Sequence, residues 1–451
     1  MRKLCVLAII VGCAGPASAA ERDGPPSRFG VDAPELAHLG EFPVGIRTLH
    51  LVQQEQADVL SFDAATGSAP RVDRPLTVEL WYPAQPAPHA PHVVYTASLP
   101  SEPPAAPAQF SIPGIAVRDA PPSGTGHPLI IVSHGYSNHP DAMTWLTENL
   151  ASKGYVVAAI VHDDPPITDR TRFAQLLMRR PLDIAFVAQT LQSSLAVERL
   201  IDPARTALIG YSMGGYGVLT VAGAVLDPGG GAVKRIPGGM MLPFARGGVL
   251  RDSLNVKGLR AVVVISPAGG GALASWGTAG VSAITAPLLL IAGDDDRTVD
   301  YATGARAIFA TASSARRFLL TFKGGGHALG LNPVPDAMRQ RLWDQDWFED
   351  PVWRKERITA INAHFITAFL DRYVLNVESR DAYLDVPVTE SSAGVWPAAT
   401  PPLAYDAYSP GTAGITVWKG FQRKQAAGLE LLQAQAGCGG EDARHILCAR
   451  P

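Results

Sequence analysis

A serine flanked by glycines lies between an apolar run and a helical pattern near the middle of the chain. The segment TALIGYSMGGYGVL, residues 206–219, places Gly210 and Gly214 two residues to either side of Ser212. A sharp strand-to-helix turn lifts such a serine hydroxyl clear of a sheet, and it needs glycines where side chains would collide. The G-x-S-x-G pattern also arises by chance in glycine-rich chains, but its position between a buried strand and a helix predicts a nucleophile.

A serine hydroxyl is a weak nucleophile at neutral pH, so a base and an orienting acid are expected. In a strand–turn–helix arrangement they follow in the order Ser, acid, His. The segment PLLLIAGDDDRTV supplies three aspartates, Asp294, Asp295 and Asp296, of which only one can orient a histidine. The next apolar run, in RRFLLTFKGGGHALG, ends at three glycines and His327. The aspartates could instead be a solvated charge run, but the order and the strand-end positions favour a triad.

A tetrahedral intermediate also needs backbone N–H donors for its oxyanion. Met213, directly after the serine, offers one at the start of the helix, and Tyr136 in IIVSHGYSN offers a second, with Gly135 permitting a tight turn. His134 in the same loop is interpreted as a structural histidine. The residues 162–164, His-Asp-Asp, end another strand at the same face; they could contact substrate or a metal, but a polar strand end is the commoner explanation.

The elements that must position these residues form an alternating pattern. Between residue 128 and about residue 375, apolar runs of about five residues alternate with helical patterns. Strands buried on both faces and separated by helices are typical of a parallel sheet covered by helices, in which reactive groups collect beyond the carboxyl ends of the strands. We therefore predict one α/β domain over residues 128–375. One of its helices, PLDIAFVAQTLQSSLAVERL, is predicted to carry Pro181 in its first turn.

Segments outside this pattern are predicted to be extensions and an insertion. In an N-terminal extension, residues 21–127, LTVELWYPA alternates like a half-buried strand, whereas residues 99–128 are too proline-rich for regular structure. An insertion at residues 227–258 is predicted to lie over the site. Its apolar residues are predicted to line a substrate pocket: Met240, Met241, Leu242 and Phe244.

The predicted C-terminal extension covers residues 376–451. Within it, FQRKQAAGLELLQAQ could form a short helix. Four aromatic residues indicate that the extension packs on another part of the structure and is not a free tail: Trp396, Tyr405, Tyr408 and Trp418. Cys438 and Cys448 are predicted to form a disulfide, because an even pair in an exported chain most simply does so. With His445 they lack a fourth ligand and make a poor zinc motif.

The first twenty residues have the pattern of a signal peptide. Arg2 and Lys3 precede an apolar run, and Ala17-Ser18-Ala19 provides a small-residue cleavage site. The mature protein is therefore predicted to be exported, either periplasmic or secreted. Lipid attachment at Cys13 is a minor alternative, because that cysteine lies very early for a lipoprotein.

The composition of the chain limits its partners. The 451 residues are 47% hydrophobic and 18% charged, with a formal net charge of -3. The sequence contains no basic stripe, which argues against nucleic acid as a partner. No segment after the signal peptide is a continuous apolar stretch long enough to span a bilayer. We expect a small-molecule substrate, no nucleic acid, no stable membrane insertion, no cofactor and no metal, with the oligomeric state left open.

The motifs PLIIVSHGYSN, GYSMGG, AGDDDRTV and GGGHA together resemble the serine-nucleophile, dienelactone-hydrolase-like branch of the α/β hydrolases. They are similar to platelet-activating-factor acetylhydrolases and bacterial polyester hydrolases over roughly residues 75–375. The resemblance implies an α/β-hydrolase fold, with Ser212 as nucleophile and His327 as base. It also implies Asp296 as the acid, between Gly293 and Val299, and the N–H groups of Tyr136 and Met213 as the oxyanion hole. True dienelactone hydrolases use a cysteine nucleophile, which this chain lacks at that position.

The sequence thus predicts an exported serine hydrolase that cleaves carboxylic esters through an acyl-enzyme and needs no cofactor. The alternatives are a polyester or phospholipid-acetyl hydrolase, or a non-catalytic module that uses the hydrolase fold for binding. The acyl and alcohol groups of the substrate stay open.

Overall fold

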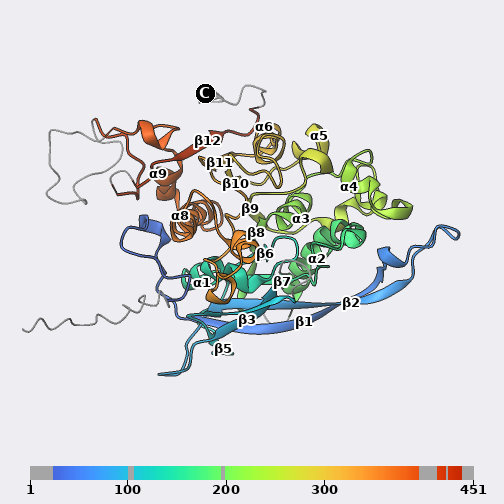
Figure 1. Cartoon of the computed structure of the whole chain (residues 1–451), viewed down its shortest axis with the longest axis horizontal. Coiled ribbons are helices and arrows are strands. Elements are labelled where there is room, and N and C mark those ends of the chain that lie inside the picture. Colours follow the sequence, from blue (N-terminus) through green and yellow to red (C-terminus); the bar gives the residue numbers. More distant parts are fainter. Residues whose placement is uncertain (1–23, 100–105, 195–198, 396–413, 423–424, 439–451) are drawn as a thin grey trace, which may run out of the picture.

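The computed structural model describes residues 24–99, 106–194, 199–395, 414–422 and 425–438 (Figure 1). Within these residues, one large sheet has the strand order β12-β11-β10-β9-β8-β6-β7-β2-β1-β5. Its strands are β1 (Val44–Ala57), β2 (Arg71–Pro83), β5 (Val117–Arg118), β6 (His127–Ser133), β7 (Val156–Val161), β8 (Ile201–Tyr211), β9 (Leu259–Ile265), β10 (Leu288–Gly293), β11 (Arg317–Phe322) and β12 (Leu429–Ala434).

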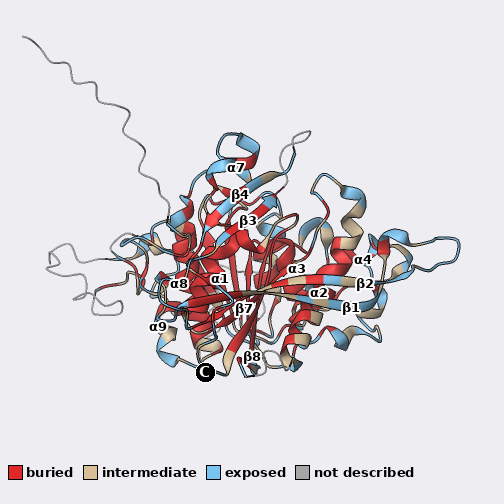
Figure 2. Ribbon diagram, turned by 90° about the horizontal axis from the view of Figure 1, so that it is seen from below, coloured by how far each residue is buried: buried red, intermediate tan, exposed pale blue. Residues whose placement is uncertain are grey.

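The middle of the sheet is parallel, and the pairings on either side of it are antiparallel except that the short edge strand β5 pairs in parallel with β1. Strands β7, β6, β8, β9, β10 and β11 pair in parallel, whereas β2 joins β7, β1 joins β2 and β12 joins β11 antiparallel. Every residue of β10 and β11 is buried, because helices cover both faces and these strands are rich in Leu, Ile and Phe. Figure 2 shows this buried interior, with exposed residues gathered at the periphery.

Two hydrophobic cores lie on the two faces of the sheet. Along β6, Leu129 and Ile131 contribute to one core and Ile130 and Val132 to the other, because successive side chains of a strand point to opposite faces. The first core contains helices α2 (Phe173–Ser193), α3 (Met213–Val221) and α6 (Ala307–Thr311); the second contains α1 (Thr144–Ser152) and α8 (Lys355–Tyr373). In Figure 1, α1 and α8 lie on one side of the sheet and α2 and α3 on the other.

Shorter helices complete the chain. They are α4 (Gly231–Lys234), α5 (Gly277–Val281), α7 (Leu342–Phe348) and α9 (Asp381–Leu384), one π-helical turn, η9 (Ala302–Arg306), and 3₁₀ turns η1 (Glu35–Ala37), η2 (Val59–Ser61), η3 (Pro140–Met143), η4 (Arg170–Arg172), η5 (Pro237–Gly239), η6 (Leu242–Phe244), η7 (Arg251–Leu254), η8 (Gly271–Leu273), η10 (Asp336–Met338), η11 (Glu378–Arg380) and η12 (Ser391–Ala393). A mostly parallel sheet with helices on both faces confirms the predicted α/β-hydrolase fold class.

Helix α2 differs from the prediction at its start. The helix begins at Phe173, so Pro181 lies inside it and not in its first turn. Proline has no N–H and leaves the carbonyl four residues earlier, that of Leu177, without its helical donor. The buried hydroxyl of Tyr216 in α3 donates to this carbonyl at 3.0 Å. A donor from the neighbouring helix thus lets α2 continue through the proline.

The proline-rich stretch before the domain contains a strand, so the prediction that it lacks regular structure is wrong there. Strand β4 (Ala108–Pro113) pairs antiparallel with β3 (Val94–Leu99). Alternate residues face the core, and Tyr95, Phe110 and Ile112 are buried. The apolar alternation outweighs the prolines because Pro113, at the strand's end, interrupts no central ladder.

The C-terminal extension also differs from the prediction. Residues 429–434 form β12, which pairs antiparallel with β11, and not a short helix. The edge of β11 provides hydrogen-bond partners that the local sequence does not reveal, and such tertiary context overrides helix propensity. Trp418 is buried against Phe365 and Phe421. The other three aromatic residues, Trp396, Tyr405 and Tyr408, lie outside the described residues.

Several predictions concern residues that the structure does not describe. The signal peptide at residues 1–20, with Cys13, lies outside the described part, and so does Cys448. Export and the Cys438–Cys448 disulfide therefore stay predictions. Among the described residues, no helix combines the length and the apolar character needed to cross a membrane.

Candidate active site

Ser212 occupies the turn between β8 and α3. Its φ of 52° is left-handed, which is strained for a residue with a side chain and persists only where the surroundings impose it. A Cβ on Gly210 would lie 2.5 Å from the backbone of Gly214, and one on Gly214 would collide with the carbonyl of Ser133. The two glycines that flank the serine are therefore required by close backbone contacts across the turn.

The structure brings Ser212, His327 and Asp296 together. The Nε2 atom of His327 lies 3.0 Å from Ser212 Oγ, and its Nδ1 atom lies 2.8 Å from Asp296 Oδ2. The carboxylate only accepts, so Nδ1 carries the proton and Nε2 is left to accept the serine proton. The other oxygen of Asp296 accepts the N–H groups of Thr298 and Val299 at 2.9 and 3.2 Å, which fixes the carboxylate.

The two neighbouring aspartates have other partners. Asp295 is exposed and pairs with Arg297 at 3.0 Å. Asp294 accepts the N–H of Gly324 at 2.5 Å and lies 3.9 Å from Lys323. Among these three adjacent carboxylates, Asp296 is the one within hydrogen-bond distance of His327.

The site is mostly enclosed but open at the histidine. Asp296 and Ser212 are 4% and 7% exposed, whereas the His327 side chain is 20% exposed. The ring of Tyr211 lies beside the imidazole, with the centroids 5.5 Å apart. A solvent-accessible base above a nearly buried acid suits proton transfer to a group that enters from outside.

Four side chains hold the loop that carries His327. Each donates to one of four consecutive backbone carbonyls, at residues 327, 328, 329 and 330. The donors are Tyr211 (3.4 Å), Lys355, Asn362 (2.9 Å) and Trp145 (2.8 Å), in that order. They come from β8, α8 and α1, so three separate elements determine the position of His327.

Two backbone N–H groups without a described acceptor belong to segments that adjoin Ser212. A Cβ on Gly135 would be 3.4 Å from the Cβ of Ser212, so the loop after β6 runs directly past the serine. The N–H of Tyr136 in this loop and that of Met213, the first residue of α3, have no acceptor among the described residues. A helix start leaves its first N–H groups unpaired, and such donors suit a developing negative charge.

His134, in the same loop, is buried and paired. Its Nδ1 donates to the carbonyl of Gly135 at 2.7 Å, and its Nε2 accepts the N–H of His162 at 3.3 Å. Burial, and then the charge of Arg180, hold the pKa of His134 well below its usual value. This neutral, fully bonded ring agrees with the structural interpretation of His134.

A buried polar network lies next to this loop. The carboxylate of Asp183 in α2 accepts two hydrogen bonds from Arg74 in β2, both at 2.7 Å, and one from His162 Nδ1 at 3.0 Å. His162 Nε2 in turn lies 2.9 Å from Ser133 Oγ. Burial lowers the pKa of His162 to about 4. Burial alone would raise the pKa of Asp183, but the hydrogen bonds and charge of Arg74 outweigh it and lower that pKa to about 2.

The sequence analysis missed the charged members of this network. Arg180 and Asp183 stand in the segment MRRPLDI, and a charged residue in a helix usually faces solvent. The sequence does contain a signal for them. Arg180 and Asp183 stand among the apolar residues of the helical repeat, and this position indicates that their side chains face the core. Their partners Arg74 and Asp164 lie on other elements. Among the described residues no group of three His, Cys, Asp or Glu side chains could hold a metal ion.

The insertion at residues 227–258 packs on the helices of the first core. The Gln189 side chain of α2 donates to the carbonyls of Ser253 and Asn255, both at 2.9 Å. Met241 has no exposed surface and fills the core, so in this structure it does not line an open pocket. Leu242 is 46% exposed, and Met240 and Phe244 are partly buried against the core. A substrate-binding role for these three stays a prediction.

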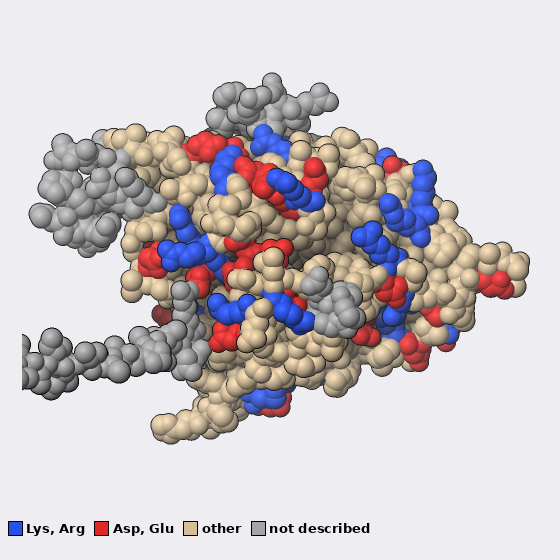
Figure 3. Space-filling model, viewed as in Figure 1, with Lys and Arg blue, Asp and Glu red and all other residues tan. Residues whose placement is uncertain are grey.

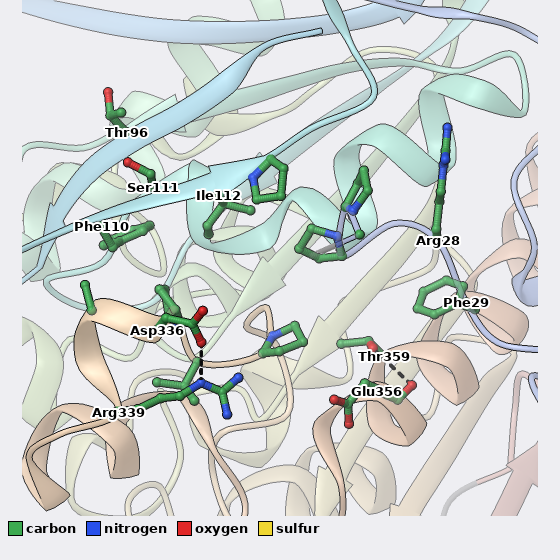
Figure 4. Close-up of a pocket in the computed structure, with 18 of the residues that line it drawn as sticks. Arg28, Phe29, Thr96, Phe110, Ser111, Ile112, Asp336, Arg339, Glu356 and Thr359 are labelled. Atoms are coloured by element: carbon green, nitrogen blue, oxygen red, sulfur yellow. Dashed lines mark hydrogen bonds and ion pairs between the residues drawn. The ribbon is translucent and has the colours of Figure 1, made fainter. Parts of the chain in front are cut away.

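A separate cavity of about 750 Å³ lies between the N-terminal segment, the β3–β4 hairpin and the start of α8 (Figure 4). Its walls include Arg28, Phe110 and Glu356, and an ion pair between Asp336 and Arg339 at 2.8 Å. None of the triad residues lines it. The face seen in Figure 3 carries acidic and basic side chains interspersed, and it is hollowed near its centre.

Comparisons with known proteins match one part of the chain. A family described as PET hydrolase-like matches residues 120–226, which include Tyr136, Ser212 and Met213 but not Asp296 or His327. Cutinase est2 of Thermobifida alba is 37% identical over 93 residues, 21% of this chain and 29% of that protein. Lipase 1 of Moraxella sp. (strain TA144) is 37% identical over 97 residues, 21% of this chain and 27% of that protein. The match thus spans less than a third of the length of these relatives.

Among solved structures, a ferulic acid esterase from Streptomyces cinnamoneus aligns with a TM-score of 0.48 and 20% identity, over 76% of this chain and 94% of that one. The matches to PET hydrolase-like proteins and cutinases support the resemblance to α/β-hydrolase esterases. The dienelactone-hydrolase-like branch stays a prediction, because the matches name PET hydrolases and cutinases.

Proposed function

We propose that this protein hydrolyses carboxylic esters, with Ser212 as nucleophile, His327 as general base and then acid, and Asp296 as the group that orients the imidazole. The observation that carries the proposal is the pair of hydrogen bonds, 3.0 and 2.8 Å long, that joins the three side chains at a strained turn. The match to a PET hydrolase-like family supports it, because the matched residues 120–226 contain the serine turn. The similarity to cutinases also supports ester hydrolysis.

In the first half of the reaction, Ser212 Oγ bonds to the acyl carbon while its proton moves to His327 Nε2. The carbonyl oxygen becomes an oxyanion and accepts hydrogen bonds from the N–H groups of Tyr136 and Met213. Asp296 stabilises the imidazolium through Nδ1 without taking its proton. When the C–O bond to the alcohol breaks, Nε2 returns the proton to the leaving oxygen and an acyl-enzyme is left.

In the second half, a water molecule takes the place of the alcohol. His327 removes its proton, the hydroxide oxygen attacks the acyl carbon, and the same two N–H groups hold the second oxyanion. Collapse of this intermediate returns the proton to Ser212 and releases the carboxylic acid. Every proton that moves passes through Nε2, so no cofactor is required.

The substrate class is proposed more narrowly from the comparisons. A polyester is favoured over a phospholipid acetyl group, because the matching family is described as PET hydrolase-like and several relatives are cutinases. The insertion at residues 227–258 is short, so we expect turnover of dissolved short and medium acyl esters as well. Export, proposed from the first twenty residues, would give the enzyme access to such substrates outside the cell.

The test combines ester turnover with labelling by a fluorophosphonate, which reacts with activated serines. The parental protein should hydrolyse nitrophenyl esters and become labelled, and Ser212→Ala should lose activity on the order of 10³-fold or more while keeping its fold. A folded parental protein that neither turns over esters nor takes up the label would instead be a binding module.

A further inference from the structure

The guanidinium of Arg180 is fully buried behind the loop that runs past Ser212. Its NH1 donates to Ser133 Oγ at 3.1 Å and to the carbonyl of His134, and its NH2 donates to the carbonyl of Gly135 at 2.9 Å. The residue lies in the middle of α2, where its charge has no access to water. All of these bonds go to consecutive residues of one loop.

Two bonds to the Gly135 carbonyl, from Arg180 NH2 at 2.9 Å and from His134 Nδ1 at 2.7 Å, determine where the next N–H points. In a trans peptide, the C=O of one residue and the N–H of the following residue point in opposite directions. The Gly135 carbonyl faces Arg180 inside the protein, so the N–H of Tyr136 faces the other way. Because Gly135 lies against Ser212, that other side is the space beside the serine hydroxyl.

On this basis, and resting on the proposed function, we propose that Arg180 is a positioning residue that aims the Tyr136 N–H at the oxyanion. Arg180 does not touch substrate and acts through the peptide that it holds. Without Arg180, the His134 ring alone would hold the Gly135 carbonyl, and the carbonyl of His134 would lose its own donor. The peptide would then be held less firmly, and the Tyr136 N–H would lose part of its alignment with the negative charge in the transition state.

Asp164 holds the same loop from the other side of Tyr136. Its Oδ2 accepts from the Arg180 guanidinium and from the backbone N–H of Ser137, the latter at 3.0 Å. Ser137 has a φ of 53°, a left-handed conformation that needs such support. Tyr136 is thus bracketed by a held carbonyl before it and a held N–H after it.

The geometry requires an arginine. A planar guanidinium contacts the two carbonyls, Ser133 Oγ and Asp164 at once, through two nitrogens in a fixed fork. A lysine presents one nitrogen at the end of a flexible chain and cannot reach both sides of this arrangement. Arg180→Lys therefore keeps the positive charge but removes the alignment.

Arg179 provides a matched control. It is the preceding residue of α2 and is also buried, but it donates to the carbonyl of Ala57 and to Gln56 Oε1, away from the Ser212 loop. Arg179→Lys thus removes the same chemical group from the same helix without changing a bond to the loop.

The experiment measures kcat and KM with nitrophenyl butyrate, and the affinity for a trifluoromethyl ketone, which forms a tetrahedral oxyanion on a reactive serine. For Arg180→Lys we expect kcat to fall about 10- to 100-fold, because a misaligned oxyanion donor should cost part of what its complete removal costs. KM should change by less than about threefold. Affinity for the ketone should fall in parallel. Arg179→Lys should keep kcat within about twofold, although both variants lose stability.

Equal kcat values in the two lysine variants of an active enzyme would overturn this inference and leave the proposed function intact. A parental enzyme without ester turnover would overturn both. If Arg180→Lys does not fold, Asp164→Asn provides the test. Asp164 lies on a loop and holds the N–H of Ser137, on the other side of Tyr136 from the Gly135 carbonyl. Asp164→Asn should lower kcat about 10-fold at constant KM, and an unchanged kcat would contradict the proposal.

Discussion

The described part of the chain contains two Ser–His–Asp constellations with nearly the same geometry. In one, Ser212, His327 and Asp296 are joined at 3.0 and 2.8 Å; in the other, Ser133, His162 and Asp183 are joined at 2.9 and 3.0 Å. In both sets the serine hydroxyl contacts Nε2 of the histidine, and the aspartate carboxylate contacts Nδ1. Residue types and distances therefore do not distinguish them.

The two sets differ in what else their atoms contact. Ser133 Oγ accepts from Arg180 and Asp183 accepts from Arg74, and all three members of that set are buried. Ser212 Oγ is bonded to His327 alone among the described residues, next to two unpaired N–H groups and an imidazole that solvent can reach. Free hydrogen-bonding capacity and access, rather than the presence of the three side chains, distinguish the set that is proposed to be reactive from the buried set.

The largest expected effect concerns Asp296, the carboxylate of the set that contains Ser212 and His327. Asp296→Asn should lower kcat on the order of 10³- to 10⁴-fold, because the amide cannot hold His327 in the tautomer that accepts the serine proton. Asp294→Asn and Asp295→Asn are the controls and should keep most activity. Steady-state kinetics on one ester measures all three. If Asp295→Asn proves the most damaging, the acid has been assigned to the wrong residue.

The corresponding change in the buried set of Ser133, His162 and Asp183 should lower the free energy of unfolding. Asp183→Asn leaves the charge of Arg74 buried without its counter-ion, which costs about 3–5 kcal/mol in free energy of unfolding. Urea denaturation followed by circular dichroism measures this loss. The same measurement on Asp296→Asn should show a much smaller change. Equal destabilisation by the two substitutions would remove the distinction drawn between the sets.

The buried histidine should also make stability depend on pH. The pKa of His162 is lowered to about 4 in the folded protein, so between that value and 6.5 the unfolded chain binds more protons. Its contribution is therefore present above pH 6.5 and is lost as the pH falls toward 4, by about 2 kcal/mol between pH 7 and pH 5.

The variant His162→Gln isolates that contribution, since glutamine can donate to Asp183 and accept from Ser133 but does not titrate. For this variant, the free energy of unfolding should change between pH 7 and pH 5 by about 2 kcal/mol less than it does for the parental protein. Buried Asp141, whose pKa is raised to about 7 by burial, acts in the opposite direction but is present in both proteins and cancels. An unchanged difference would mean that His162 is protonated in the fold.

The smallest effect is expected in the loop of His327. Trp145→Phe removes the donor to the Gly330 carbonyl but keeps an aromatic ring, and it should cost about 1 kcal/mol in stability. Because three other side chains still hold the loop, kcat should change less than about threefold. Thermal unfolding and ester kinetics test both values. A loss of kcat as large as that of Arg180→Lys would show that this loop, too, depends on one residue.

These two sets also show what the sequence could predict. The positions of Ser212 and His327, and the run of three aspartates that contains Asp296, follow from local signals, namely glycines at a turn and polar residues just after apolar strands. The choice of Asp296 among the three aspartates follows from the resemblance to α/β hydrolases. The buried set has no local signal, because Arg74 and Asp183 are 109 residues apart in sequence and pair only after β2 and α2 have packed. The same reason explains Pro181 in α2, where the compensating hydroxyl of Tyr216 comes from another helix.

The strand at the end of the chain has a consequence for synthesis. Strand β11 is apolar and fully buried, and its free edge is covered by β12, which the ribosome makes more than a hundred residues later. Until then the nascent protein presents an unpaired apolar edge, which is a template for pairing with another chain. Prematurely terminated products that lack residues 429–434 should therefore accumulate as aggregates, so we expect β12 to protect the protein from aggregation during its synthesis.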